Sequence, residues 1–133
     1  MVTVEQFQVR AIGPARPGVV VLAVSGALDF GTEQLLGDAG SRALAGGCRR
    51  LVLECAGVTF CDSQGLNRFL KLRREAERGG AALVLAAIST PVRHVLELTG
   101  ALPVFGLADT VDEALRAAGD ADADTPGRGI PAI

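Results

Sequence analysis

The residues best suited to chemistry lie together at Asp62, Ser63 and Gly65, where an apolar segment gives way to a helical pattern. We expect residues 57–66 to form a short strand that breaks into a helix. In the first turn of a helix the backbone N–H groups lack helical partners and the helix dipole is positive. A hydroxyl held there can be presented to another protein and can accept a phosphoryl group. Ser63 is therefore the candidate phosphoacceptor.

A plainer role for Ser63 is to cap the helix with its side chain, which typically stabilises a protein by ~1 kcal/mol. Asp62 can supply that cap instead, which would leave the hydroxyl of Ser63 available. Gly65 removes a side chain at a point where another backbone could approach closely. The apolar face of the helix begins only at Leu66. Capping stays open as an alternative, and these neighbours favour a presented hydroxyl.

Other catalytic and ligand-binding arrangements have little support in the sequence. Asp29 and Asp62 are a candidate carboxylate pair for a glycosidase, but roles in a turn and a cap explain them better. His94 is the only histidine and lies far along the chain from Ser63, which argues against a Ser-His-Asp triad. The three cysteines form no CxxC pair, and no glycine loop for phosphate or dinucleotide occurs. We expect no catalytic residue, no metal and no cofactor, and cysteines that act as small buried hydrophobes.

Charge and composition narrow the class of protein. The chain has 133 residues and a net charge of -2, which gives no electrostatic reason to expect binding to nucleic acid or to an anionic membrane. No stretch approaches the ~20 apolar residues of a membrane-spanning helix. Residues 1–6 lack the basic and apolar regions of a secretory signal. We therefore expect a cytoplasmic protein.

Hydrophobic periodicity predicts one α/β domain over residues 1–118. The expected strands are 4–12, 19–24, 51–55 and 81–86, with a short edge strand at 104–105. The expected helices begin near residues 32, 63, 90 and 110. The order is β-β-α-β-α-β-α-(β)-α, which gives a mixed four- to five-stranded sheet with helices packed on it. Residues 119–133 have no periodic apolar face and are expected to be disordered.

Turn and capping residues predict where the elements begin and end, and the apolar periodicity predicts which helix residues face the core. Residues 13–18 are typical of a turn, Thr90 is expected to cap the third helix, and Thr110 and Glu113 have the spacing of a capping box. The residues expected to face the core are Leu35, Leu36, Ala39, Ala43 and Leu44 in the first helix, Leu66, Phe69, Leu70, Leu72 and Ala76 in the second, and Val92, Val95, Leu96 and Thr99 in the third. The second helix also carries a basic run, expected to face solvent or an acidic partner: Arg68, Lys71, Arg73, Arg74 and Arg78.

Three motifs, in order along the chain, resemble those of a known family. Residues 57–66 resemble the signature of STAS domains, specifically of bacterial anti-sigma factor antagonists, which read close to G-V-x-F-x-D-S-S-G-L. Residues 25–29 resemble the G-E-L-D turn of that family, and residues 92–101 resemble its V-R-R-V-L-E-L-T-G-L segment. The resemblance runs from Val4 to Ala118 and implies a STAS-like fold.

The resemblance implies a binding switch. In the family, the serine after the aspartate is phosphorylated by the anti-sigma factor, which is itself a kinase; here that serine is Ser63. The unphosphorylated antagonist binds the anti-sigma factor and frees a sigma factor, and a metal-dependent serine phosphatase resets the cycle. ATP would then enter bound to the partner kinase. Gln64 stands where many members have a second Ser or Thr, and Ala27 replaces the usual Glu.

The expected partner-binding residues surround this serine: Asp29, Asp62, Ser63, Gln64, Gly65, Leu66, Asn67 and Arg68. Two other classes of protein stay open. One is a STAS scaffold or transporter-associated domain that binds without being phosphorylated. The other is a small enzyme or nucleotide-binding protein.

Overall fold

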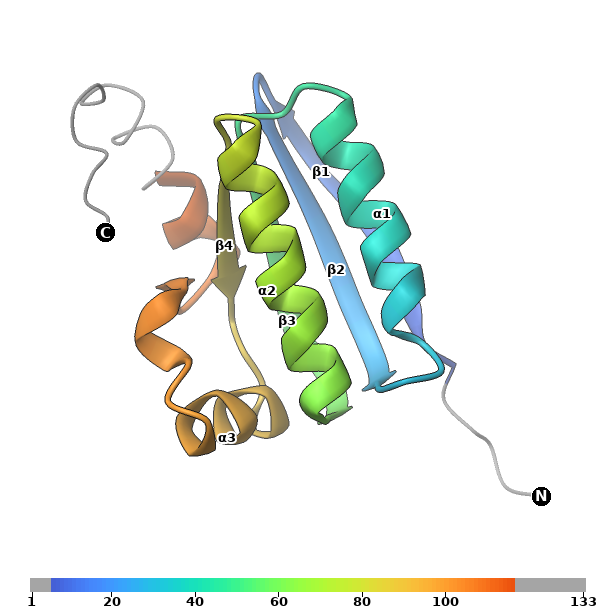
Figure 1. The fold of residues 1–133 in the computed structure, drawn as a ribbon. Coiled ribbons are helices and arrows are strands. Elements are labelled where there is room, and N and C mark those ends of the chain that lie inside the picture. The colour runs from blue at the N-terminus through green and yellow to red at the C-terminus, as the bar shows by residue number, and fades with distance from the viewer. Residues whose placement is uncertain (1–5, 117–133) are drawn as a thin grey trace.

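A five-stranded mixed sheet forms the centre of the molecule. The computed structural model describes residues 6–116, and its strands lie in the order β1-β2-β3-β4-β5 (Figure 1). β1 pairs antiparallel with β2, and the remaining neighbours are parallel. This arrangement confirms the predicted mixed sheet with an antiparallel edge strand. The strands are β1 (Gln8–Arg16), β2 (Val19–Leu28), β3 (Arg50–Cys61), β4 (Ala82–Ala86) and β5 (Gly106–Ala108).

Two long helices, α1 (Glu33–Ala45) and α2 (Ser63–Arg78), lie side by side on one face of the sheet (Figure 1). The shorter α3 (Thr90–Leu98) lies at the end of the sheet where α2 begins. A single-turn 3-10 helix spans Leu102–Val104. A further helical stretch over residues 111–116 packs on the opposite face, where Ala114 joins a second apolar cluster on the sheet. No helix within residues 6–116 is long and apolar enough to cross a membrane.

The central strand and the second helix have the apolar pattern that their positions require. Leu51, Val52 and Leu53 in β3 are fully buried, because helices cover both faces of the sheet there. Phe69 and Leu72 of α2 are also fully buried against that sheet. The core-facing residues of α2 were therefore predicted correctly, with Leu70 half-buried at the margin.

Two predicted core positions were wrong. Leu35 is exposed because its neighbour Leu36 takes the position that faces the sheet. Thr99 is exposed as the C-cap residue just after α3, where its hydroxyl donates to the carbonyl of Val95 at 2.7 Å. Each residue lies at the border of an apolar stripe, where periodicity alone does not separate buried from exposed.

Several predicted boundaries also moved. β1 continues to Arg16, so the predicted turn at 13–18 is confined to residues 17 and 18. β2 and β3 run further than predicted, to Leu28 and Cys61, with two irregularities of register between them. The last strand begins at Gly106 rather than at residue 104, because the preceding residues around Pro103 form the 3-10 turn.

Of the two predicted capping interactions at helix starts, one was wrong and one was confirmed. α3 begins one residue early, with Ser89 as the N-cap, and no side chain caps it, so the predicted cap from Thr90 was wrong. The capping signal at Thr110 was confirmed: its Oγ1 accepts from the Glu113 backbone N–H at 3.0 Å, and Glu113 Oε1 accepts from the Asp109 N–H at 2.9 Å. The predicted end of this helix at residue 118 and the predicted tail at 119–133 lie outside the described residues.

Candidate functional site

The neighbouring strands β2 and β3 end at the same level and bring Asp29 and Asp62 to the same end of the sheet. In the parallel pairing of β2 with β3, Leu28 is the register partner of Cys61. The next residue on each strand is an aspartate, and the backbone N–H of Asp62 donates to the carbonyl of Leu28 at 3.4 Å. Neighbouring strands lie about 5 Å apart, so the two aspartates leave the sheet as close neighbours.

Asp62 caps α2 and leaves Ser63 uncommitted. Asp62 has an extended backbone, and its Oδ1 accepts from the N–H groups of Gln64 at 2.9 Å and Gly65 at 3.2 Å. Ser63 is therefore the first residue of the helix rather than its cap, and it is exposed to solvent. The capping alternative for Ser63 is thereby decided against, because Asp62 fills that role.

The neighbouring turn at Asp29 is held by its own hydrogen bonds. The Oδ1 of Asp29 accepts from the Gly31 N–H at 2.9 Å. The hydroxyl of Thr32 accepts from the Asp29 N–H at 3.0 Å and donates to the carbonyl of Ala27 at 2.6 Å. These bonds fix the link between β2 and α1, so this turn presents a defined surface beside Ser63.

Gly65 serves the interior of the domain rather than the approach of a partner backbone. A Cβ at Gly65 would lie 2.8 Å from Cys61 Sγ and 2.9 Å from Leu28 Cγ. The glycine lets α2 pack directly on the ends of β2 and β3. Leu66 is also buried, whereas Gln64 and Asn67 are exposed around the start of the helix.

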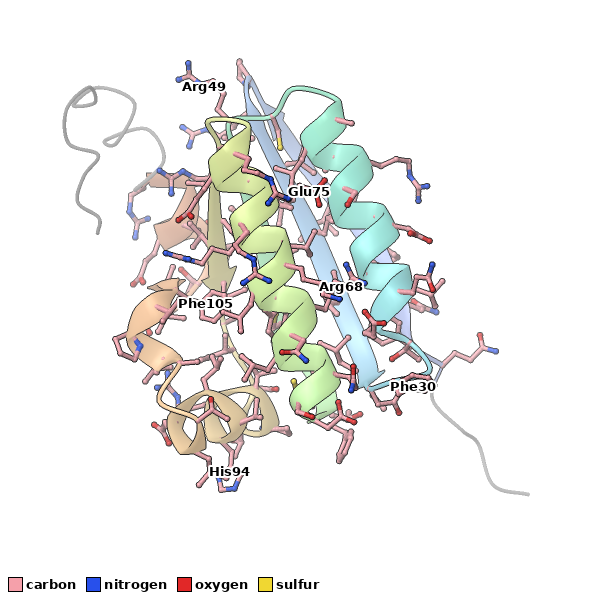
Figure 2. The ribbon with its side chains drawn as sticks, in the orientation of Figure 1. Phe30, Arg49, Arg68, Glu75, His94 and Phe105 are labelled. Atoms are coloured by element: carbon pink, nitrogen blue, oxygen red, sulfur yellow. The ribbon has the colours of Figure 1, made fainter. Side chains whose placement is uncertain are left out.

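Arg68 belongs to the contact between the two helices. Its Nε lies 2.7 Å from Glu33 Oε1, and a Cβ at Gly37 would lie 2.6 Å from its guanidinium carbon. The expectation that Arg68 faces outward was therefore wrong, since its side chain lies between α2 and α1 (Figure 2) and is only 17% exposed. Elsewhere in the basic run, Arg73 lies 3.1 Å from Glu77. An acidic partner surface would meet the exposed Lys71, Arg74 and Arg78 instead.

Two exposed aromatic side chains flank the turn and were not singled out by sequence reasoning. Phe30 is 79% exposed immediately after Asp29, and Phe60 is 49% exposed shortly before Asp62. Phe69 and Phe105, in contrast, pack edge to face in the core with ring centroids 6.2 Å apart. The available signal was a phenylalanine close to each aspartate: Phe30 directly follows Asp29, and Phe60 lies two residues before Asp62.

The cysteines and the histidine add no reactive group to this site. Burial, with a smaller effect from the Asp62 carboxylate, raises the pKa of Cys61 to about 12. Cys55 is fully buried, Cys48 is half-buried and His94 is exposed on α3 (Figure 2). Within residues 6–116 no cluster of three or more His, Cys, Asp or Glu side chains could hold a metal ion. All three cysteines are free. They were expected to be small buried hydrophobes, which is confirmed for Cys55 and Cys61, whereas Cys48 is only half-buried.

A pocket of about 440 Å³ lies elsewhere, between the second half of α2, β4 and the 3-10 turn, lined in part by Arg73, Leu83 and Phe105. It shares no residue with the turn at Ser63. The chemistry available at Ser63 is therefore that of an exposed hydroxyl in the first turn of α2, accessible to a macromolecule from outside.

The sequence profile of the STAS domain family matches residues 12–114, most of the described fold. The chain belongs to the STAS domain family. A STAS-domain containing protein of Pseudomonas aeruginosa is 30% identical over 100 residues, which are 75% of this chain and 98% of that protein. The anti-sigma F factor antagonist of Paenibacillus polymyxa is 25% identical over 99 residues, covering 74% of this chain and 85% of that protein.

STAS domains also occur inside larger proteins. Human sulfate anion transporter 1 is 38% identical to this chain over 69 residues, but the chain spans only 10% of the transporter's length. A sulfate transporter family protein from Wolinella succinogenes, 20% identical with a TM-score of 0.69, has the same fold. The transporter likeness therefore concerns the STAS domain alone.

Solved structures of anti-sigma factor antagonists have a fold similar to that of this chain. An anti-sigma factor antagonist from Mycobacterium paratuberculosis is 27% identical, with a TM-score of 0.74 over 85% of this chain and 96% of that structure. The anti-sigma factor antagonist SpoIIAA in its unphosphorylated form is 26% identical, with a TM-score of 0.70 over 86% of this chain and 97% of that structure. The mixed sheet and its helices are thus those of anti-sigma factor antagonists.

Proposed function

We propose that this STAS domain is an anti-sigma factor antagonist that binds an anti-sigma factor while Ser63 is unphosphorylated and releases it after phosphorylation. The observation that carries the proposal is the position of Ser63: exposed, first in α2, and relieved of capping by Asp62. Similar structures of two antagonists, at 27% and 26% identity, support the same class of function.

A phosphate on Ser63 would be compatible with the fold. The first turn of a helix offers unpaired N–H groups and the positive end of the dipole, both of which favour an anion. Because Ser63 is exposed, the group need not displace core side chains. We therefore expect phosphorylation to leave the domain folded.

The same phosphate would oppose binding. It adds about -1.5 to -2 charges next to Asp62 and beside the turn that carries Asp29. Like charges brought together in an interface cost several kcal/mol, and ~1.4 kcal/mol corresponds to a tenfold change in affinity. We expect phosphorylation to weaken binding by orders of magnitude.

In this cycle the chain is a binding protein and a phosphoryl acceptor, not an enzyme. The anti-sigma factor acts as the serine kinase: the oxygen of Ser63 attacks the γ-phosphorus of ATP held by the kinase, ADP leaves, and a base of the kinase takes the hydroxyl proton. A metal-dependent serine phosphatase returns Ser63 to the hydroxyl. The proposed partners place this cycle in the cytoplasm, without nucleic acid, membrane or bound cofactor.

The test mixes the purified chain with candidate anti-sigma factors and ATP and measures its intact mass. We expect a gain of one phosphoryl group, absent in Ser63→Ala. Thr59→Ala is the matched control, because Thr59 is an exposed hydroxyl near the same strand end and should not alter the gain. A phosphoryl group that persists in Ser63→Ala would contradict the assignment.

The second half of the proposal is tested by binding. Ser63→Asp should fold normally and bind the anti-sigma factor much more weakly than the unmodified chain. Equal affinity in an equilibrium titration would mean that charge at Ser63 does not control the complex.

The second candidate function is that of a STAS scaffold or transporter-associated domain, which binds a partner without being phosphorylated. It is favoured by the 38% identity to a sulfate transporter over 69 residues. It predicts stable binding to a partner with no phosphate on Ser63 under any kinase tested. The mass measurement above therefore separates the two.

A further inference from the structure

We propose that Phe30 and Phe60 are apolar anchors that flank Ser63 and insert into an apolar groove on the partner protein. This inference rests on the proposed function and adds to it the residues that supply affinity. Asp29, Asp62 and Ser63 then control binding through their charge, and the two phenylalanine rings supply binding affinity.

The exposure of the two rings is the first argument. Phe30 is 79% exposed and Phe60 is 49% exposed, while Phe69 and Phe105 of the same chain are buried. A single exposed apolar residue is ordinary, but here two exposed aromatic rings lie at the same end of the sheet, where β2 and β3 finish. Buried aromatic residues at the centre of an interface commonly supply most of its binding energy.

The placement of the rings is the second argument. Phe60 is the register partner of Ala27, one pair before Leu28 and Cys61. Since Cys61 faces α2, alternation along the strand directs Phe60 to the opposite face of the sheet. Phe30 follows Asp29 on the neighbouring strand end, at the end of the molecule where α2 begins (Figure 2).

The backbones that carry the rings are already fixed. The turn at Phe30 is closed by the bond from the Thr32 N–H to the Asp29 carbonyl at 3.2 Å and by the Asp29 side chain. Phe60 lies within the β2–β3 pairing. Little ordering entropy remains to be lost on binding, which favours anchors of this kind.

The negative charge near the two rings indicates that the molecule bound there is a different protein, rather than a membrane, a nucleic acid or a second copy of this chain. Asp29 directly precedes Phe30, and Asp62 lies two positions after Phe60, so each ring has a carboxylate close to it along the chain. Anionic lipid and nucleic acid would be repelled, and two copies would bring four carboxylates together. The complementary surface is an apolar groove bordered by basic side chains, on the anti-sigma factor.

The experiment measures the equilibrium dissociation constant between the anti-sigma factor and the full chain carrying Phe30→Ser, Phe60→Ser or Phe60→Leu. We expect each serine variant to bind about tenfold more weakly or worse, as residues that dominate an interface do. Phe60→Leu should recover part of the affinity because it stays apolar. Leu107→Ser, 41% exposed on β5 at the far edge of the sheet, is the matched control and should bind as the unmodified chain does.

The outcomes separate this inference from the proposed function. If the unmodified chain is phosphorylated at Ser63 and binds, but both serine variants bind equally well, the anchors are wrong and the function stands. If no anti-sigma factor binds or phosphorylates the unmodified chain, both proposals fail. If the chain forms dimers that Phe30→Ser dissolves, a second copy is the occupant and the inference is overturned. Circular dichroism of each variant guards against misfolding, and Phe30→Ser alters a side chain that is largely in solvent.

Discussion

The carboxylate oxygen Oε1 of Glu33 lies 2.7 Å from Nε of Arg68, and this ion pair joins the helix after the Asp29 turn to the helix that begins at Ser63. The guanidinium lies over Gly37, where no side chain intervenes. Further along the same helix pair, the Ser41 hydroxyl donates to a Glu75 carboxylate oxygen at 2.8 Å. The two turns that present the candidate site are thus held relative to each other.

We expect the pair of Glu33 and Arg68 to contribute measurable stability. The two side chains are only 20% and 17% exposed, so solvent screens them less than a surface pair. A double-mutant cycle of Glu33→Ala and Arg68→Ala, followed by urea unfolding, should give a coupling free energy of about 1 kcal/mol. The pair of Arg93 and Glu97, 3.8 Å apart and about half exposed, is the control and should show almost no coupling. Equal coupling in the two cycles would contradict the role given to burial.

Gly65→Ala should destabilise the domain by about 1–3 kcal/mol, despite the better helix propensity of alanine. The new methyl group would lie 2.8 Å from Cys61 Sγ and 2.9 Å from Leu28 Cγ, and both of these side chains are buried. Gly79→Ala at the other end of α2 is the control, because its Cβ would meet only ordinary contacts at 3.7 Å or more and its φ is -93°. Chemical denaturation measures both, and an unchanged midpoint for Gly65→Ala would refute the packing argument.

Asp62→Ala should lower the free energy of unfolding by ~1 kcal/mol, because two N–H groups of α2 lose their acceptor. Asp62→Asn keeps a side-chain oxygen in place and should retain most of the stability. The amide also removes one negative charge beside Ser63. Phosphorylated Asp62→Asn should therefore bind its partner less weakly than the phosphorylated unmodified chain; identical affinities would argue against repulsion at this position.

Cys61 should resist alkylation in the folded protein. Its pKa, raised by burial from 9.0 to about 12, leaves almost no thiolate near pH 8. Cys48 is half-buried and its pKa is raised too, so iodoacetamide should label it slowly and label all three thiols only in urea. Mass spectrometry counts the labels, and rapid native labelling of Cys61 would contradict its position.

The same shift has a consequence for stability. The folded state keeps the proton of Cys61 at pH values where the unfolded state has lost it. Its contribution to stability is therefore complete below pH 9 and decreases as the pH rises from 9 towards about 12. The free energy of unfolding should fall over this range, and the fall should be smaller in Cys61→Ala.

The sequence by itself determined the order of strands and helices and the location of the candidate site. Continuous apolar runs such as residues 51–53, short and bounded by polar residues and glycines, favour strands covered on both faces. The start of the second helix at Asp62 and Ser63 could be predicted because capping is a local interaction within a few residues. The cap at Thr110 could be predicted for the same reason. Such features depend on neighbours along the chain, which the sequence displays.

Only the tertiary structure decided which side chains at that junction face a partner. Arg68 forms an ion pair with Glu33, 35 positions away in the sequence. Gly65 packs against Cys61 and Leu28 of this chain rather than against another molecule. Phe30, just after β2, and Phe60, near the end of β3, are left exposed by the packing of the surrounding elements. Contacts between distant segments depend on packing and strand register, which no local pattern of residues encodes.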